Sequence, residues 1–350
     1  MKAGAFQGSG AHGARKNGGA TGDHARDKGA EHSGTTGSTG VTGGTRRGML
    51  VEVQRRTATV RESDGTETLC AYSPGIRLGE FSNFAVGDQV EYYPGDAAQE
   101  PLITAILPRT SKISRPGPGE RHARELILAA NVDLLVVVAA AAQPAFNARL
   151  LDRYLAVAER FGIEAIVCIN KIDLKPGIPP EAAYLGGIGY VVTSCSATSG
   201  AGIDALRDRL RGRLAVLSGP SGAGKSSLIR ALVPGADPRT GEVRESDGKG
   251  RHTTTTSHLY ATPDEDGRPG VRIIDTPGLR ELGLWNVTPG EVAEFWRDFR
   301  PYLGRCRFSD CAHRTEPGCA VRAAVDEGAI PDFRLQSYYR VLETLAGDDD

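Results

Sequence analysis

The feature that most constrains the fold of this chain is the run from Gly219 to Ser226. It reads GPSGAGKS and matches the P-loop pattern G-x-x-x-x-G-K-[ST] at every fixed position. The apolar residues 214–217 before it predict a buried strand, and residues 227–232 after it predict a helix. A strand, a glycine-rich loop and a helix in this order are typical of α/β domains with a mostly parallel sheet.

The P-loop predicts a nucleotide site. Glycines let the backbone turn so that successive N–H groups point at phosphate oxygens, and the positive end of the following helix faces the same phosphates. We expect Lys225 to reach the β- and γ-phosphates and Ser226 to hold Mg²⁺. The alternative is a glycine-rich turn that binds nothing, which the flanking strand and helix disfavour. The predicted contacts are Gly219, Pro220, Ser221, Gly222, Ala223, Gly224, Lys225, Ser226 and Ser227.

A second motif, N-K-x-D at residues 170–173, ends another apolar run. Its form predicts guanine recognition. The Asp173 carboxylate would accept two hydrogen bonds from guanine that adenine does not offer, and losing such a pair is costly. Asn170 belongs to the same element, and we expect Lys171 to lie along the base.

A shorter segment follows the strand-like residues 190–193. We expect its backbone at Ser196 and Ala197 to meet the guanine oxygen. The segment is informative only through its position after N-K-x-D, because so short a sequence is common.

Two further loops would complete the nucleotide site. Asp275 and Gly278 belong to a D-T-P-G sequence after the strand-like residues 271–274. There a carboxylate suits Mg²⁺, and a glycine N–H can sense the γ-phosphate. Alone, such a sequence is usually only a turn, and its position after a P-loop is what indicates switch II. Thr253 and Thr254 lie between the P-loop and the D-T-P-G sequence and predict switch I. The alternative is a simple polar loop.

These elements occur in the order base, base, P-loop, switch I, switch II, whereas the P-loop comes first in most GTPases. With GPSGAGKSSL from Gly219, GRHTTT from Gly250 and DTPG from Asp275, the chain resembles a family of circularly permuted GTPases, the bacterial ribosome small-subunit-dependent GTPase A. The resemblance covers residues 48–345. It implies GTP hydrolysis in late maturation of the small (30S) ribosomal subunit, binding to 16S rRNA, and stimulation by the subunit.

A metal site is predicted near the C-terminus by the spacing C-x₄-C-x-H-x₅-C, at Cys306, Cys311, His313 and Cys319. Three thiolates and one imidazole suit a tetrahedral, structural zinc ion, and such clustering in an intracellular chain favours metal over disulfides. The alternative is a chance cluster, and the resemblance implies the same zinc set. The remaining cysteines are expected to be ordinary packing residues: Cys70, Cys168 and Cys195.

Residues 48–110 predict five short strands separated by turn signals, which suits a small barrel such as an OB-fold. OB-folds often bind looped or single-stranded RNA through basic and aromatic side chains. An equally weighted alternative is that these side chains only cover the barrel. The candidates are Arg55, Arg56, Arg77, Tyr92 and Tyr93.

The N-terminal residues 1–47 contain 13 glycines and almost no large apolar residue, with seven Lys/Arg against three Asp/Glu. We predict that they are disordered; contact with RNA is one interpretation of their charge, and a solubilising tail is the simpler one. No signal peptide is predicted, and the longest apolar run, residues 134–142, is too short to cross a bilayer. We therefore expect a cytoplasmic protein without a membrane partner.

Three expectations concern the segments between and after these motifs. The basic, Pro- and Gly-rich residues 108–119 predict a linker. Residues 289–302 predict one helix that docks the zinc domain through an apolar face. Because the permuted order leads from switch II into that domain, we hypothesise that the nucleotide state repositions it. The residues of this apolar face are Val292, Phe295, Trp296 and Phe299.

Catalysis is the point at which the sequence departs from signalling GTPases. Leu279 stands where they carry the glutamine that orients the attacking water. A leucine side chain cannot polarise water, so the enzyme is slow alone or uses another group. His252 is the nearest candidate, at a position that the family shares, with a packing or capping histidine as the alternative. Together with Lys225, His252 is our catalytic candidate.

The sequence thus predicts a disordered tail (1–47), an OB-fold barrel (48–110), a permuted α/β P-loop GTPase domain (111–287) and a helical zinc-binding domain (288–350). We expect a monomer that binds GTP or GDP, Mg²⁺ and one structural Zn²⁺. Two other functions remain open. An RNA-binding adaptor would carry a purely structural nucleotide. A GTP-dependent metallochaperone would need an exchangeable metal, against which a closed Cys₃His set argues.

Overall fold

The computed structural model describes most of the chain after the predicted tail, and the described residues all belong to one compact unit. Several predicted features lie outside the described residues: residues 1–43 of the tail, Arg77, and the switch residues His252, Thr253, Thr254, Gly278 and Leu279. The described residues are 44–73, 76, 84–116, 125–238, 257–264, 269–276, 284 and 286–347.

The N-terminal part is a five-stranded barrel. The strands β1, β2 and β3 form an antiparallel meander, β3 pairs in parallel with β5, β5 pairs with β4, and β4 closes on β1. Alternate residues such as Ala58 and Val60 are fully buried inside it, as expected for strands with one inward face. The predicted small barrel is confirmed, and β1 begins inside the predicted tail. The strands are β1 (Arg46–Val53), β2 (Thr57–Arg61), β3 (Glu67–Tyr72), β4 (Gln89–Tyr93) and β5 (Leu102–Ile106).

The predicted linker at residues 108–119 is partly wrong. β6 (Lys112–Pro116) pairs antiparallel with β7 (Glu125–Ala130) and forms a separate two-stranded ribbon. Ile113 and Ala129 lie opposite each other in this ladder, and both are completely buried. Apolar burial across the pair therefore outweighs the proline, glycine and charge signals that favoured a linker.

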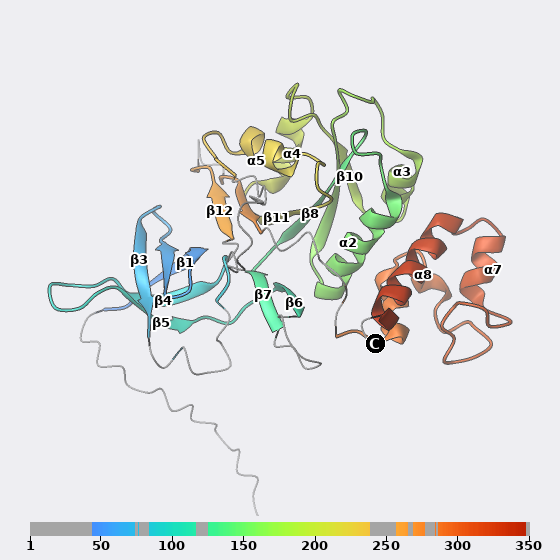
Figure 1. Cartoon of the computed structure of the whole chain (residues 1–350), viewed down its shortest axis with the longest axis horizontal. Coiled ribbons are helices and arrows are strands. Elements are labelled where there is room, and N and C mark those ends of the chain that lie inside the picture. Colours follow the sequence, from blue (N-terminus) through green and yellow to red (C-terminus); the bar gives the residue numbers. More distant parts are fainter. Residues whose placement is uncertain are drawn as a thin grey trace, which may run out of the picture. The chain divides into compact units, whose positions relative to one another are not determined.

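The central domain is an α/β sheet in the order β10-β9-β8-β11-β13-β12, parallel except for β12, as predicted (Figure 1). Successive residues of β8 belong alternately to two apolar clusters, one with α2 and the other with α4 and α5, so helices cover both faces. β12 also pairs with β1, through Glu52 and His258. The elements are β8 (Leu134–Ala140), α2 (Ala148–Phe161), β9 (Glu164–Asn170), α3 (Pro180–Gly187), β10 (Val191–Ser194), α4 (Ile203–Leu210), β11 (Leu214–Ser218), α5 (Lys225–Leu232), β12 (His258–Ala261) and β13 (Arg272–Asp275).

The C-terminal part is helical, but the single helix predicted over residues 289–302 is wrong. The chain forms three short pieces, and Trp296 adopts an extended backbone between two of them. Pro301 also has no N–H to donate inside a continuous helix. The apolar face nevertheless packs, because Trp296 and Phe299 lie against the Tyr338 ring at centroid distances of 5.5 and 5.3 Å. The elements are α6 (Pro289–Val292), η2 (Ala293–Phe295), η3 (Arg300–Tyr302), α7 (Ala320–Asp326) and α8 (Asp332–Gly347).

Within the part of the chain that the structure describes, no helix has the length and apolar character needed to span a membrane.

Candidate functional site

The P-loop leaves the carboxyl end of β11 and approaches its neighbours very closely. A Cβ at Gly219, where φ is +140°, would lie 2.1 Å from the carbonyl oxygen of Val138 in β8. A Cβ at Gly224, where φ is +92°, would lie 2.3 Å from the side-chain amide of Asn170. Only glycine fits at these two positions. Because glycine has no side chain, the P-loop can pack directly against β8 and the N-K-x-D element.

Asn170 joins the three predicted base and phosphate elements. This buried side chain donates a hydrogen bond to the carbonyl of Ala223 in the P-loop at 2.9 Å. Its oxygen accepts one from the backbone N–H of Ala197 at 3.2 Å. Segments far apart in the sequence therefore meet at one edge of the sheet, at the carboxyl ends of β9, β10 and β11, where α/β sheets commonly bind ligands.

Asp173 is exposed, and its carboxylate is held in place by one neighbour. Ser196 Oγ donates to Asp173 Oδ1 at 2.5 Å and itself accepts from the Ser199 N–H at 3.0 Å. Lys171, with φ of +64°, donates through its ammonium group to the carbonyl of Gln143 in the loop before α2. No sequence signal pointed to Gln143, because its contribution is a backbone oxygen.

Lys225 begins α5 and folds back over the P-loop. Its ammonium group donates to the carbonyl oxygens of Gly219 and Pro220, each at 2.8 Å. Ser226 follows it in the first turn of α5 and is partly buried, whereas Ser221, Gly222 and Ser227 are exposed. Asp275 is the last residue of β13, the strand that pairs with β11, so this carboxylate and the P-loop follow neighbouring strands.

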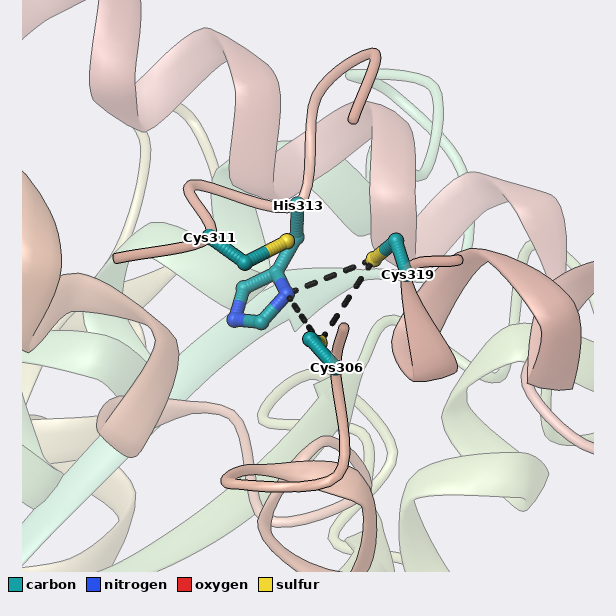
Figure 2. Close-up of side chains that lie close together, drawn as sticks. All are labelled: Cys306, Cys311, His313 and Cys319. Carbon is teal, nitrogen blue, oxygen red and sulfur yellow. Dashed lines mark hydrogen bonds between the residues drawn. The ribbon is translucent and has the colours of Figure 1, made fainter. Parts of the chain in front are cut away.

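The four predicted metal ligands converge in the C-terminal part (Figure 2). Their ligand atoms all lie within 4.8 Å of one another. His313 Nδ1 is 3.5 Å from Cys306 Sγ and 3.4 Å from Cys319 Sγ, and the two sulfurs are 4.0 Å apart. A tetrahedron with Zn–S of about 2.3 Å and Zn–N of about 2.0 Å has edges of roughly 3.8 Å (S–S) and roughly 3.5 Å (S–N). The donor set therefore has the size and chemistry for zinc.

Neighbouring groups hold the metal ligands in position. The Ala320 N–H donates to Cys306 Sγ at 3.4 Å, and the Arg322 N–H donates to Cys319 Sγ at 3.5 Å. These N–H donors at the start of α7 fix the two sulfurs in the orientation that faces the other ligands. Burial lowers the pKa of His313, so its ring is neutral at neutral pH, the form that ligates metals. Tyr339 on α8 adds a hydrogen bond to the His313 carbonyl at 2.9 Å.

The barrel tyrosines do not form the aromatic surface that the sequence suggested. Tyr92 and Tyr93 are both buried, and their hydroxyls donate to Glu62 and Asp96 respectively. Arg55 is exposed in the turn between β1 and β2, as is Arg56. The three remaining cysteines are buried, as expected for packing residues: Cys70, Cys168 and Cys195.

The sequence of this chain is similar to those of known GTPases. Residues 106–285 match the family model described as RsgA GTPase. A Gemmatimonas aurantiaca protein named small ribosomal subunit biogenesis GTPase RsgA is 46% identical over 266 residues, 75% of this chain and 85% of its own length. A Vibrio vulnificus protein named small ribosomal subunit biogenesis GTPase RsgA 1 is 37% identical over 313 residues, 87% of this chain and 85% of its own length.

Two solved structures are similar over most of the chain. YjeQ from Thermotoga maritima superposes with a TM-score of 0.68 at 30% identity, covering 87% of this chain and 99% of that one. YloQ, described as a circularly permuted GTPase, superposes with a TM-score of 0.62 at 25% identity, covering 87% and 96%. Both similarities extend well beyond the residues matched by the family model.

Proposed function

This chain belongs to the RsgA GTPase family, and we propose that its hydrolysis of GTP to GDP and phosphate serves late maturation of the small ribosomal subunit. The observation that carries the proposal is the similarity, over 85% of their lengths, to relatives named for small ribosomal subunit biogenesis. As a member of a GTPase family the chain binds and hydrolyses GTP. The 30S subunit and its 16S rRNA are the proposed partners of a monomer in the cytoplasm.

For the base, we propose that Asp173 reads guanine, with Lys171 along the ring and the backbone at Ser196 and Ala197 near the guanine oxygen. The hydrogen bond from Ser196 to Asp173 supports this role, because it orients the carboxylate. Asn170 would hold the base elements against the P-loop through its bonds to Ala223 and Ala197.

For the phosphates, we propose that the P-loop backbone from Gly219 to Ser227 surrounds them and that Lys225 neutralises their charge. Ser226 and Asp275 would hold Mg²⁺, which would neutralise negative charge on the phosphates. The assignments of His252 to catalysis and of Thr253, Thr254 and Gly278 to the switches rest on sequence alone.

The metal set Cys306, Cys311, His313 and Cys319 would hold one structural zinc ion per chain, as supported by the donor distances. All four positions would be filled by protein, so no position remains for water or substrate. We propose domains close to those expected from the sequence, with the barrel starting at β1. The GTPase domain would follow over residues 111–287 and the zinc domain over 288–350.

The direct test of the ribosomal role is GTP turnover with and without purified subunits. We expect slow hydrolysis by the isolated protein, because Leu279 offers no group that orients the attacking water. With 30S subunits the rate should rise at least severalfold, because the subunit would hold switch I in its catalytic arrangement. His252→Ala should reduce the stimulated rate much more than nucleotide affinity. Equal stimulation by 50S subunits or free RNA, or none by 30S, would contradict the proposal. Binding without any turnover would favour an RNA-binding adaptor.

Guanine recognition is tested by Asp173→Asn. The amide presents a donor where guanine also presents one, so GTP affinity should fall by at least tenfold, since a lost bond to a charged group costs about 1.5–3 kcal/mol. Xanthosine triphosphate, whose base offers an acceptor there, should bind better than GTP. Isothermal titration with both nucleotides provides the measurement, and Asp326→Asn, at the exposed end of α7, is the matched control. Unchanged preference for GTP would refute the assignment.

A further inference from the structure

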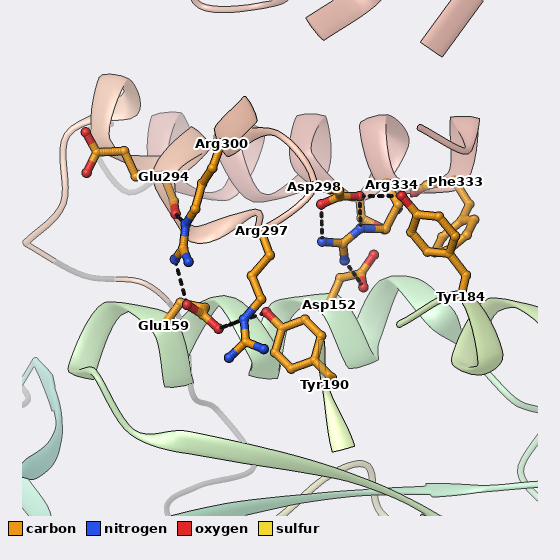
Figure 3. A network of polar contacts seen from close by, with 11 residues as sticks. Asp152, Glu159, Tyr184, Tyr190, Glu294, Arg297, Asp298, Arg300, Phe333 and Arg334 are labelled. Atoms are coloured by element: carbon orange, nitrogen blue, oxygen red, sulfur yellow. Dashed lines mark hydrogen bonds and ion pairs between the residues drawn. The ribbon is translucent and has the colours of Figure 1, made fainter. Parts of the chain in front are cut away.

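The C-terminal module, residues 286–347, contacts the GTPase domain through two groups of charged side chains, which we call the clamp (Figure 3). One group joins Arg334 of α8 to Asp152 of α2 and Asp298. The other joins Glu159 of α2 to two arginines of the module, Arg297 and Arg300. Neither group is used by the proposed nucleotide or metal sites.

The first group is buried. The Arg334 side chain is 1% exposed, and its Nε and one terminal nitrogen donate to the two oxygens of Asp298, each at 2.8 Å. Its other terminal nitrogen donates to Asp152, whose side chain is fully buried. Breaking such a contact leaves charges that neither water nor a partner compensates, so α2 and α8 are held firmly together.

The second group lies nearer the surface and reaches a further strand. Glu159 accepts hydrogen bonds from Arg297 and Arg300, each at 2.6 Å, and from the hydroxyl of Tyr190 at 3.0 Å. The guanidinium of Arg297 stacks 3.9 Å over the Tyr190 ring and donates to the Gly189 carbonyl at 2.7 Å. Tyr190 directly precedes β10.

The elements of the GTPase domain that the clamp contacts adjoin the base-reading residues in the chain. α2 follows the loop whose Gln143 carbonyl accepts from Lys171. α3, whose Tyr184 hydroxyl donates to Asp298 at 3.2 Å, follows the N-K-x-D element. β10 runs from Tyr190 towards Ser196, which holds Asp173. The module therefore supports the half of the GTPase domain that would surround the base.

We propose that the clamp is a positioning device for guanine recognition. Docking of the C-terminal module holds α2, α3 and β10 in the arrangement that binds the base, so Arg334 and Glu159 set nucleotide affinity without touching the nucleotide. This inference rests on the proposed assignment of the base site. Coupling between two sites is reciprocal, so bound nucleotide stabilises docking of the module by the same factor.

The test uses the full-length, zinc-loaded protein carrying Arg334→Met. We expect the GDP dissociation constant and the KM for GTP to rise about tenfold, a coupling of about 1.4 kcal/mol, while kcat stays unchanged. Arg340→Met is the matched control, because Arg340 is exposed on the same helix. Glu159→Gln keeps the shape of the side chain and leaves the buried group intact, and a twofold to fivefold rise is expected from it.

Hydrogen exchange provides the reciprocal measurement. Saturating GDP should slow exchange of the α8 amides about tenfold in the unmodified protein and have little effect in Arg334→Met. The inference is overturned if both clamp variants bind GDP like Arg340→Met, or if GDP leaves exchange in α8 unchanged in the unmodified protein. Asp173→Asn separates the two proposals. If it behaves as expected while the clamp variants do not, only the coupling fails.

Discussion

Replacing Cys311 with serine is expected to release the metal and unfold the C-terminal module while the GTPase domain stays folded. The apparent binding free energy of structural zinc is about 10–16 kcal/mol in zinc-finger peptides, and this energy is folding free energy. In this variant two sulfurs and the ring of His313, whose atoms lie within 4.8 Å of one another, would have no metal charge to hold them together. Metal analysis, circular dichroism and limited proteolysis beyond residue 286 would report the loss.

The same variant should still bind GDP, with the weakening expected for Arg334→Met, because both changes release the module from α2. Cys70→Ser is the control, since Cys70 lies in the barrel core and outside the metal set. That variant should keep its zinc and its helical signal. Stoichiometric zinc retained by Cys311→Ser, or absent from the unmodified protein, would contradict the prediction.

The nucleotide and metal motifs could be predicted because their chemistry fixes residue types at fixed spacings. No other residue fits at Gly219 or Gly224, because a Cβ there would lie 2.1 Å and 2.3 Å, respectively, from a neighbouring atom. Asn170 and Asp173 likewise make specific hydrogen bonds in the structure, Asn170 to Ala223 and Ala197 and Asp173 to Ser196. The strands around them are short apolar runs, and the parallel sheet follows from their alternation with helices.

Distant contacts decided two points that local sequence left open or obscured. The sequence left open whether Tyr92 and Tyr93 form an RNA-binding face or only cover the barrel, and both are buried, next to a register shift between β4 and β5 at Glu91 and Tyr92. The β6–β7 ribbon depends on pairing across residues 117–124, which local propensity does not encode. Tertiary contacts decided both cases.

The clamp escaped prediction for a related reason. Asp152 and Arg334 are charged residues on helices, and such residues normally face water. Their burial depends on partners far away in the sequence. The sequence analysis connected the zinc domain only to switch II and predicted no contact between that domain and α2. The hypothesis that the nucleotide state moves the zinc domain therefore gains a constraint, because any such movement must carry α2 with it or break a buried ion group.

The ion group itself should make stability depend on pH through Asp152. Two carboxylates share one guanidinium, so the fully ionised group carries one excess negative charge in a buried place. Burial, together with the charge of Asp298, raises the pKa of Asp152 to about 6 from its usual 3.8, although Arg334 acts in the opposite direction. Protonated Asp152 would leave a neutral Arg334–Asp298 pair.

The sign of the effect follows from linkage. A folded-state pKa above the unfolded value means that the folded protein binds this proton more tightly. The stabilising contribution is therefore fully present below pH 3.8 and is lost as pH rises through about 6. The difference of 6 − 3.8 pKa units corresponds to up to about 3 kcal/mol at 1.36 kcal/mol per unit.

Asp152→Asn, which resembles the protonated acid, should lose this dependence. Between pH 5 and pH 7.5, its unfolding free energy should rise relative to the unmodified protein by about 1.4 kcal/mol, which is roughly half of that amount, because the other half is already lost below pH 5. Arg334→Ala should instead lose about 3–5 kcal/mol of unfolding free energy at pH 7.5, because two buried carboxylates lose their cation. Urea unfolding followed by tryptophan fluorescence measures both, since Arg334 lies 5.8 Å over the Trp296 ring. Comparison at each pH cancels effects shared by the two proteins, such as proton competition at the metal ligands. A difference between Asp152→Asn and the unmodified protein that stays constant from pH 5 to 7.5 would show that Asp152 remains ionised throughout.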